Sequence, residues 1–365
     1  MSHPQTPPPS DATPAGPRAG SAIGRDATPG AATPETGQLP TEPVASRDDA
    51  GLEAARAGAP ARAGGPRRPT SLGRVAGRLR HDRAALAGAA IIALTLLTVL
   101  FADLITRAVG VDVETYNTHL LDPYGVPAGP LGGVSLEHPF GVEPQTGRDL
   151  FANVVHGTRV SIAIGLGATL LSVAIGVAIG ILAGYVGGLA DVLASRFIDI
   201  MLGFPSLIFM IAISAIVPFE FDRVTLMILI LGVFGWPSIA RVVRAETMSL
   251  RARPFVRASR SLGASSGHII GRHILPNLWA TIIVFSTISI PGKIGAEAAL
   301  SFLGVGVRPP TPSWGRTISN AVNWISTDPW YLIFPGAALF LVTYAFNVFG
   351  DGLRDALDPT TRVGR

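Results

Sequence analysis

Few side chains in this sequence have the types and spacing that catalysis requires. The 365 residues contain no cysteine, which excludes thiolate nucleophiles, thiolate metal sites and disulfides. No HExxH or GxSxG motif occurs, and no residues show paired metal-ligand spacing. His268 and His273 are five residues apart in a polar segment, where solvation or docking is favoured over metal binding. The sequence therefore predicts no catalytic residue and no metal site, and it argues against a membrane enzyme.

The single lysine, Lys293, bears on two further kinds of chemistry. A Walker A loop requires G-x-x-x-x-G-K-[ST], but Lys293 is followed by Ile294 and has Thr287 at the position of the first glycine. The chain thus carries no nucleotide-binding loop of its own. Lys293 also lies four residues before Glu297 in an apolar segment, so the two side chains can pair within the membrane if the segment is helical. A structural or gating ion pair is favoured there over a proton relay.

The segments that would position these residues are apolar enough to lie in a membrane. The chain is 48% hydrophobic and 15% charged, with a mean hydropathy of +0.42. A spanning helix needs about 20 predominantly apolar residues. The qualifying stretches run roughly from 84 to 106, 158 to 185, 196 to 217, 224 to 243, 278 to 300 and 331 to 350. The sequence therefore predicts an all-α integral membrane protein with six transmembrane helices.

Arginine placement predicts the orientation of these helices, because cytoplasmic flanks collect basic residues. Arginines cluster before the first span, between the fourth and fifth spans, and in the C-terminal tail. We therefore expect both termini and the loop between the fourth and fifth spans to be cytoplasmic. The chain has a net charge of +4, and its arginines lie beside apolar segments. This placement favours membrane lipid over nucleic acid as the binding partner of the arginines.

The chain divides into five predicted regions. Residues 1–70 form a Pro/Ala/Gly-rich cytoplasmic tail whose composition predicts disorder. Residues 71–110 hold a basic segment and the first span, and 111–155 an extracytoplasmic loop. Residues 156–350 form a five-helix core that contains the cytoplasmic loop 247–276, and 351–365 a cytoplasmic tail.

The second predicted span has a stripe of glycines, and the fourth is interrupted by a short sequence that begins with glycine. Gly176, Gly180 and Gly184 recur every four residues and line one face of the second span, where another backbone can approach closely. Helix packing is favoured over a substrate path beside this stripe. The fourth apolar stretch is interrupted at residues 235–237 by the sequence GWP.

The cytoplasmic loop contains a short amphipathic helix. A helical wheel places Phe255 on one face with Ala258, Ser259 and Leu262, and the arginines on the other. Gly263 can adopt the left-handed conformation that ends a helix, and a second helical piece then continues through Pro276 into the fifth span. This helix either lies on anionic lipid or docks a cytoplasmic partner.

The loop also resembles a known sequence family. FVRASRSLGASSGHIIGRHILP, residues 255–276, is similar to the EAA loop of binding-protein-dependent ABC importer permeases. Arg257, Ala258 and Ser259 stand at the EAA positions, and Gly263 stands at the glycine. Arginine replaces the acidic residue, serine replaces the second alanine, and His273 stands where the general pattern has isoleucine. The R-A-x form and the RHILPN ending are typical of the peptide-transport branch.

Other stretches of residues 79–359 carry the same resemblance. HPFG, GRDLF, AGYVGG and FPSL resemble that branch, as do LSFLGVGVRPPTPSWG and FGDGLRDALDP. The last two resemble the second permease of dipeptide and oligopeptide importers. VEPQT, between HPFG and GRD, is one residue longer than usual, and the tail before residue 70 matches nothing.

The resemblance implies the type I ABC importer permease fold and a permease subunit in the cell inner membrane. It implies three kinds of protein partner: a homologous second permease, two ABC ATPases that bind ATP and Mg, and an extracytoplasmic binding protein. The implied ligand is a peptide, with nickel or another small ligand as the alternative; an ion-driven secondary transporter is the rival class. The implied ATPase-coupling residues are Phe255, Arg257, Ala258, Ser259, Leu262, Gly263, Ile274, Leu275 and Pro276.

Overall fold

The computed structural model describes residues 72–218 and 220–357, and nearly all of its regular structure is helical. The disorder predicted for residues 1–70 lies outside the described residues. The helices are α2 (Leu72–Leu79), α3 (Arg83–Val109), α4 (Leu150–Val186), α5 (Gly188–Gly203), α6 (Ser206–Ile216), α7 (Arg223–Arg251), α8 (Pro254–Ser261), α9 (Ser266–Ile269), α10 (Leu275–Phe302), α11 (Trp314–Ala321) and α12 (Trp330–Leu357). A π-helical turn, Ile270–Ile274, joins α9 to α10.

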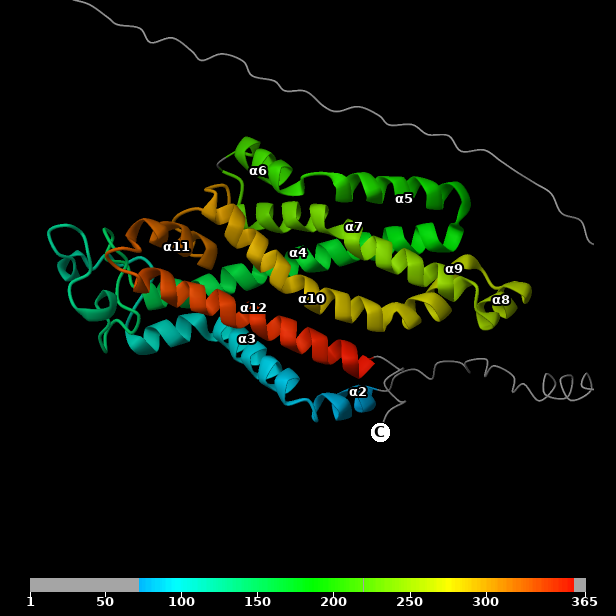
Figure 1. Cartoon of the computed structure of the whole chain (residues 1–365), viewed down its shortest axis with the longest axis horizontal. Coiled ribbons are helices and arrows are strands. Elements are labelled where there is room, and N and C mark those ends of the chain that lie inside the picture. The colour runs from blue at the N-terminus through cyan, green and yellow to red at the C-terminus, as the bar shows by residue number, and fades with distance from the viewer. Residues whose placement is uncertain (1–71, 219, 358–365) are drawn as a thin grey trace, which may run out of the picture. The chain divides into compact units, whose positions relative to one another are not determined.

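Helix α4 is the centre of the bundle. It packs against α7 on one side and against α10 and α3 on the other, and α12 packs against α3 and α10 (Figure 1). The α4–α5 turn, α8 and α9 lie at one end, which we call the basic end, and residues 111–149 and α11 lie at the opposite end (Figure 1). α12 continues to Leu357, beyond the predicted end of the last span at residue 350.

Most of the predicted spans are single helices. In the described part of the chain, five helical segments are each long and apolar enough to cross a membrane: α3, α4, α7, α12 and the segment Ser266–Phe302 that contains α10. The predicted third span over 196–217 is bent, so the described part of the chain has five such helices, or six spans if the bent pair is counted as one. α5 and α6 pass the same test only as a pair bent by 80°. The break arises at Pro205, because proline restricts the preceding residue, and Phe204 is extended with φ −88° and ψ 139°.

The predicted interruption of the fourth span does not break its helix. α7 is continuous and contains Pro237, which cannot donate a backbone hydrogen bond. Side chains from two neighbouring helices bond the carbonyls of the turn before it. Ser172 Oγ donates to the carbonyl of Gly232 at 2.8 Å, and Lys293 Nζ donates to the carbonyl of Leu231 at 2.7 Å. These side chains give two carbonyls an additional donor in a medium without water, whereas the carbonyl that loses its helical donor at Pro237 is that of Val233.

The glycine stripe of α4 packs directly against α7, as the sequence predicts. A Cβ at Gly180 would lie 2.8 Å from the carbonyl oxygen of Ala240, and one at Gly184 would lie 2.6 Å from that of Arg244. A Cβ at Gly176 would lie 2.2 Å from a side-chain carbon of Ile239. The two backbones therefore touch along a face that no larger residue could occupy, and α7, not a substrate path, fills this face.

Arginines at the opposite end are bonded to their own chain. Arg148 Nε donates to the carbonyl of Val113 at 2.8 Å, and Arg223 Nη1 donates to that of Ser214 at 3.0 Å. Arg148 lies beside Glu143, which is only 5% exposed. Burial raises the pKa of Glu143, although the charge of Arg148 acts in the other direction. Arg148 therefore joins two parts of the segment 111–149, and Arg223 joins α7 to α6. Both side chains are buried and do not contribute to a free basic surface.

Candidate functional site

The candidate site is the loop at the basic end, and its first element is α8. The helix follows Arg253, which is extended, and it has Pro254 in its first turn, where a missing amide hydrogen costs nothing. It ends as predicted. Gly263 has φ +82°, its amide donates to the carbonyl of Arg260 at 3.0 Å, and the amide of Ala264 donates to that of Ser259 at 3.1 Å. This pair of bonds is the Schellman motif, which fixes the direction of the following chain.

The second half of the loop is helical and leads into the membrane, also as predicted. Ser265 caps α9 by accepting a bond from the amide of His268 at 3.4 Å. The π-helical turn follows, and α10 begins at Leu275 with Pro276 in its first turn. Ile269 and Ile274 are buried in the cluster that joins this segment to α4 and α7. A displacement of the loop would therefore act directly on α10.

The helical wheel suggests that the apolar face of α8 is buried, but the rest of the chain covers a different face of this helix. Within α8 only Val256 is buried, at 0% exposure, and it belongs to the same cluster as Ile269 and Ile274. Phe255 is 38% exposed and Leu262 is 88% exposed. An apolar surface that its own chain leaves open marks an interaction site. Sequence reasoning did not identify Val256 as the anchor of the helix.

Ser259 and His273 join the two halves of the loop. Ser259 Oγ lies 3.1 Å from His273 Nε2, and the ring of Phe255 lies 6.0 Å from the ring of His273. Two residues at which the sequence departs from the general EAA pattern therefore contact each other. Their contact holds α8 against the π-helical turn. His268 and His273 lie with their ring centroids 6.0 Å apart.

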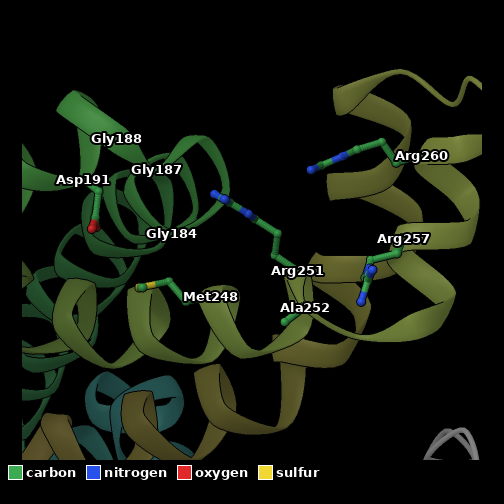
Figure 2. Close-up of a pocket in the computed structure, with 9 residues that line it drawn as sticks. All are labelled: Gly184, Gly187, Gly188, Asp191, Met248, Arg251, Ala252, Arg257 and Arg260. Atoms are coloured by element: carbon green, nitrogen blue, oxygen red, sulfur yellow. The ribbon is translucent and has the colours of Figure 1, made fainter.

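The arginines of the loop converge on the α4–α5 turn. Arg260 stacks over the ring of Tyr185 with 5.3 Å between guanidinium carbon and ring centroid, and Arg251 Nη1 donates to the carbonyl of Tyr185 at 2.8 Å. Together with Arg257 they line a cavity of about 550 Å³ between the turn and α8 (Figure 2). Sequence reasoning missed Tyr185 and Arg251 as site residues, although AGYVGG at 183–188 marks the turn.

Lys293 and Glu297 do not form the predicted ion pair. Glu297 is fully buried and accepts bonds from Ser161 Oγ at 3.2 Å and Ser301 Oγ at 2.8 Å. Lys293 reaches instead to the carbonyl of Leu231 on α7. The Lys293 ammonium group occupies space that is open because Gly235 has no side chain. A Cβ at Gly235 would lie 1.7 Å from Lys293 Nζ. Each side chain thus has partners on another helix, and no ion pair joins them in the described part of the chain.

A bundle of apolar helices with an amphipathic helix exposed at one end is typical of a multi-pass membrane protein. The comparisons with known proteins specify the class further. Residues 176–363 match the family described as binding-protein-dependent transport system inner membrane component. The chain belongs to this family, as the resemblance of the loop predicts. It is therefore a membrane transport component.

Curated relatives match most of the chain. It is 39% identical over 282 residues to the dipeptide transport system permease protein DppC of Alkalihalophilus pseudofirmus, covering 77% of this chain and 88% of the relative. Identity and coverage are the same for the glutathione transport system permease protein GsiD of Escherichia coli O1:K1 / APEC. A putative peptide permease protein of Brucella ovis is 36% identical over 300 residues, covering 81% and 94%.

Among solved structures, the chain is similar to one from the MetNI methionine ABC transporter in an inward facing conformation. The identity is 21% and the TM-score 0.46, over 57% of this chain and 98% of that chain.

Proposed function

We propose that this chain is the permease subunit through which an ATP-driven, binding-protein-dependent importer passes peptides. The observation that carries the proposal is the displayed face of α8, set at a fixed angle by Gly263 and anchored in the membrane bundle by Val256. The family membership supplies the context of a binding-protein-dependent transport system. The printed names of the relatives, for dipeptide, glutathione and peptide permeases, support a peptide ligand.

The division of labour follows from the missing Walker A loop. Lys293 is the only lysine, and its context does not fit a phosphate-binding loop. ATP and Mg then bind to two separate ABC ATPase subunits, and this chain catalyses no reaction and holds no cofactor. A homologous second permease completes the translocation path, and an extracytoplasmic binding protein delivers the ligand.

The packing of the loop suggests how closure of the ATPase subunits would move the membrane helices. Phe255 and Leu262 would contact the ATPase, because both are exposed while Val256 is buried beneath them. A movement of α8 would reach α7 through Val256, and it would reach α10 through Ile274 and the π-helical turn. Packed cores move as units and do not deform continuously. Rotation of α7 and α10 would then open or close the path.

We also propose that the basic end is cytoplasmic, and the cysteine-free sequence provides a direct test. Leu136 at the opposite end is 100% exposed, and Leu262 is 88% exposed. In intact cells with a permeabilised outer envelope, Leu136→Cys should react with a membrane-impermeant maleimide. In a chain produced without its ATPase subunits, Leu262→Cys should react only after the inner membrane is opened. Labelling of both variants from the same side would contradict the orientation.

Cross-linking of the same single-cysteine variant tests the docking role. Leu262→Cys, assembled with its partner subunits and treated with a short bifunctional maleimide–amine reagent, should give an adduct with an ATPase subunit. Val256→Cys provides the matched control, because this position of the same helix is fully buried and should give none. An accessible Leu262→Cys in an assembled complex that forms adducts only with lipid amines would overturn the docking role and favour a lipid-facing helix.

A further inference from the structure

The cavity at the basic end is built by the turn between α4 and α5. Gly187 has φ +73° and ψ −163°, a backbone conformation that essentially only glycine adopts, and Gly188 has φ +58°. A Cβ at Gly187 would lie 2.7 Å from Arg251 Nη1, so the absent side chain leaves the space that the guanidinium occupies. The turn therefore holds Arg251 at one wall of the cavity, where it also bonds the carbonyl of Tyr185.

The cavity has an excess of positive charge. Arg251, Arg257 and Arg260 line it, and none of the three has an ion pair with another described residue. Figure 2 shows Arg251 and Arg260 reaching into the space between the turn and α8. The one acidic lining residue, Asp191, is already bonded to Arg244, whose Nη2 donates to Oδ2 at 2.9 Å. The three guanidinium groups remain available to an anion.

The amino end of α5 lies at the same place. This 16-residue helix begins at Gly188, and no side chain caps it. Its first amides have no partner within the helix and carry a partial positive charge. They add to the field of the arginines that surround the cavity.

An apolar stripe on α5 leads away from the cavity. Leu189, Leu193, Phe197 and Ile200 share one helix face and are 73%, 61%, 52% and 65% exposed. Leu189 directly follows Gly188, which lines the cavity. A free phosphate ion would leave this stripe uncovered, whereas an acyl chain would lie along it. The stripe and the cavity together match the two chemical parts of one phospholipid.

We propose that the cavity binds the phosphate group of an anionic phospholipid whose acyl chains lie along α5. Arginine clusters between membrane helices at the cytoplasmic surface are suited to such headgroups. One guanidinium group can donate two parallel hydrogen bonds to the oxygens of a phosphate group. The proposal takes from the proposed function only the cytoplasmic orientation of the basic end. The bound lipid would connect the α4–α5 turn to α8 and so hold the coupling loop against the membrane.

The test measures lipid binding by the full-length chain in a neutral detergent, without its partner subunits. The probe is phosphatidylglycerol with a fluorophore on one acyl chain. We expect Arg251→Gln/Arg260→Gln to weaken its binding at least about 10-fold. Arg272→Gln removes one positive charge from the same loop outside the cavity, which matches the single variant Arg260→Gln, and it should change binding less than about two-fold. Arg260→Gln alone should weaken binding even if the double variant does not fold.

Competitors distinguish the possible occupants. Unlabelled phosphatidylglycerol should displace the probe, whereas phosphatidylcholine and inorganic phosphate should not. Leu193→Asn should also weaken binding of the probe. Displacement by inorganic phosphate at equal concentration would contradict the lipid assignment and indicate a free-anion site. Equal losses in Arg272→Gln would show only diffuse charge attraction.

The last possible occupant is an acidic surface of the ATPase. Unchanged lipid binding in the arginine variants together with weaker capture of the ATPase would assign the cavity to that partner and overturn the proposal. Because the binding assay contains no ATPase and no ATP, its result is independent of whether the chain is an importer subunit.

Discussion

Gly263→Val is expected to abolish ligand uptake while the membrane bundle still folds and inserts. Gly263 has φ +82°, and a Cβ built there meets nothing within 4 Å. The cost of the substitution is therefore conformational, about 1–2 kcal/mol for a side chain in the left-handed region. A β-branched residue is especially disfavoured there. Valine would break the Schellman motif and change the direction of the chain between α8 and α9.

A small change of direction is enough to uncouple the loop, because positioned groups tolerate shifts of only about 1 Å. The complex with Gly263→Val should either lose its ATPase or hydrolyse ATP without uptake. Subunit capture, ligand-stimulated ATP hydrolysis and uptake, measured on one reconstituted preparation, distinguish these outcomes.

Gly263→Asn is the matched control for this prediction. Asparagine tolerates the left-handed conformation, and the space beside residue 263 is open. It should therefore retain most of the uptake. Equal loss in the asparagine and valine variants would show that side-chain bulk matters and not backbone conformation. Wild-type coupling in Gly263→Val would remove the loop from the mechanism.

The second large effect is expected at Gly180, where even alanine should destabilise the folded protein. The added Cβ would lie 2.8 Å from the carbonyl oxygen of Ala240 and 2.8 Å from Cβ of Val243. Because the carbonyl belongs to the α7 backbone, α4 and α7 would have to separate. Overpacking of this kind costs typically about 1–3 kcal/mol.

Gly336→Ala is the control for this second prediction, since Gly336 is a helical glycine of α12 with nothing within 4 Å of its Cβ position. Alanine is the better helix former by about 1 kcal/mol, so this variant should be at least as stable as the parent. Thermal unfolding in detergent, followed by tryptophan fluorescence, measures both variants. A Gly180→Ala protein that melts at or above the parental temperature would contradict direct backbone contact between α4 and α7.

Local sequence signals predict the parts of this fold that depend on neighbouring residues. Hydropathy locates five of the spanning helices, and glycine spacing locates the contact of α4 with α7. The end of α8 at Gly263 follows from the conformational freedom of glycine. The break at Pro205 was missed, because an average over a window of apolar residues does not register one missing amide hydrogen.

Features that depend on tertiary contacts could not be predicted in the same way. A helical wheel groups Phe255 with Leu262, but it does not tell which face of α8 the chain itself covers. Spacing within α10 suggested a pair between Lys293 and Glu297, whereas α7 and α4 supply their actual partners. The basic cavity combines residues 184–191 with 248–260, and only the packed bundle brings these segments together.

The central claim is that ATP hydrolysis by partner subunits drives import through this chain, and uptake by reconstituted vesicles tests it most directly. The vesicles would contain this chain, its second permease and the ATPases, with binding protein and a radiolabelled dipeptide outside. We predict that accumulation requires enclosed ATP and external binding protein and continues when ionophores collapse all ion gradients. Accumulation that follows a proton or sodium gradient in the absence of ATP would contradict the account and identify an ion-driven transporter.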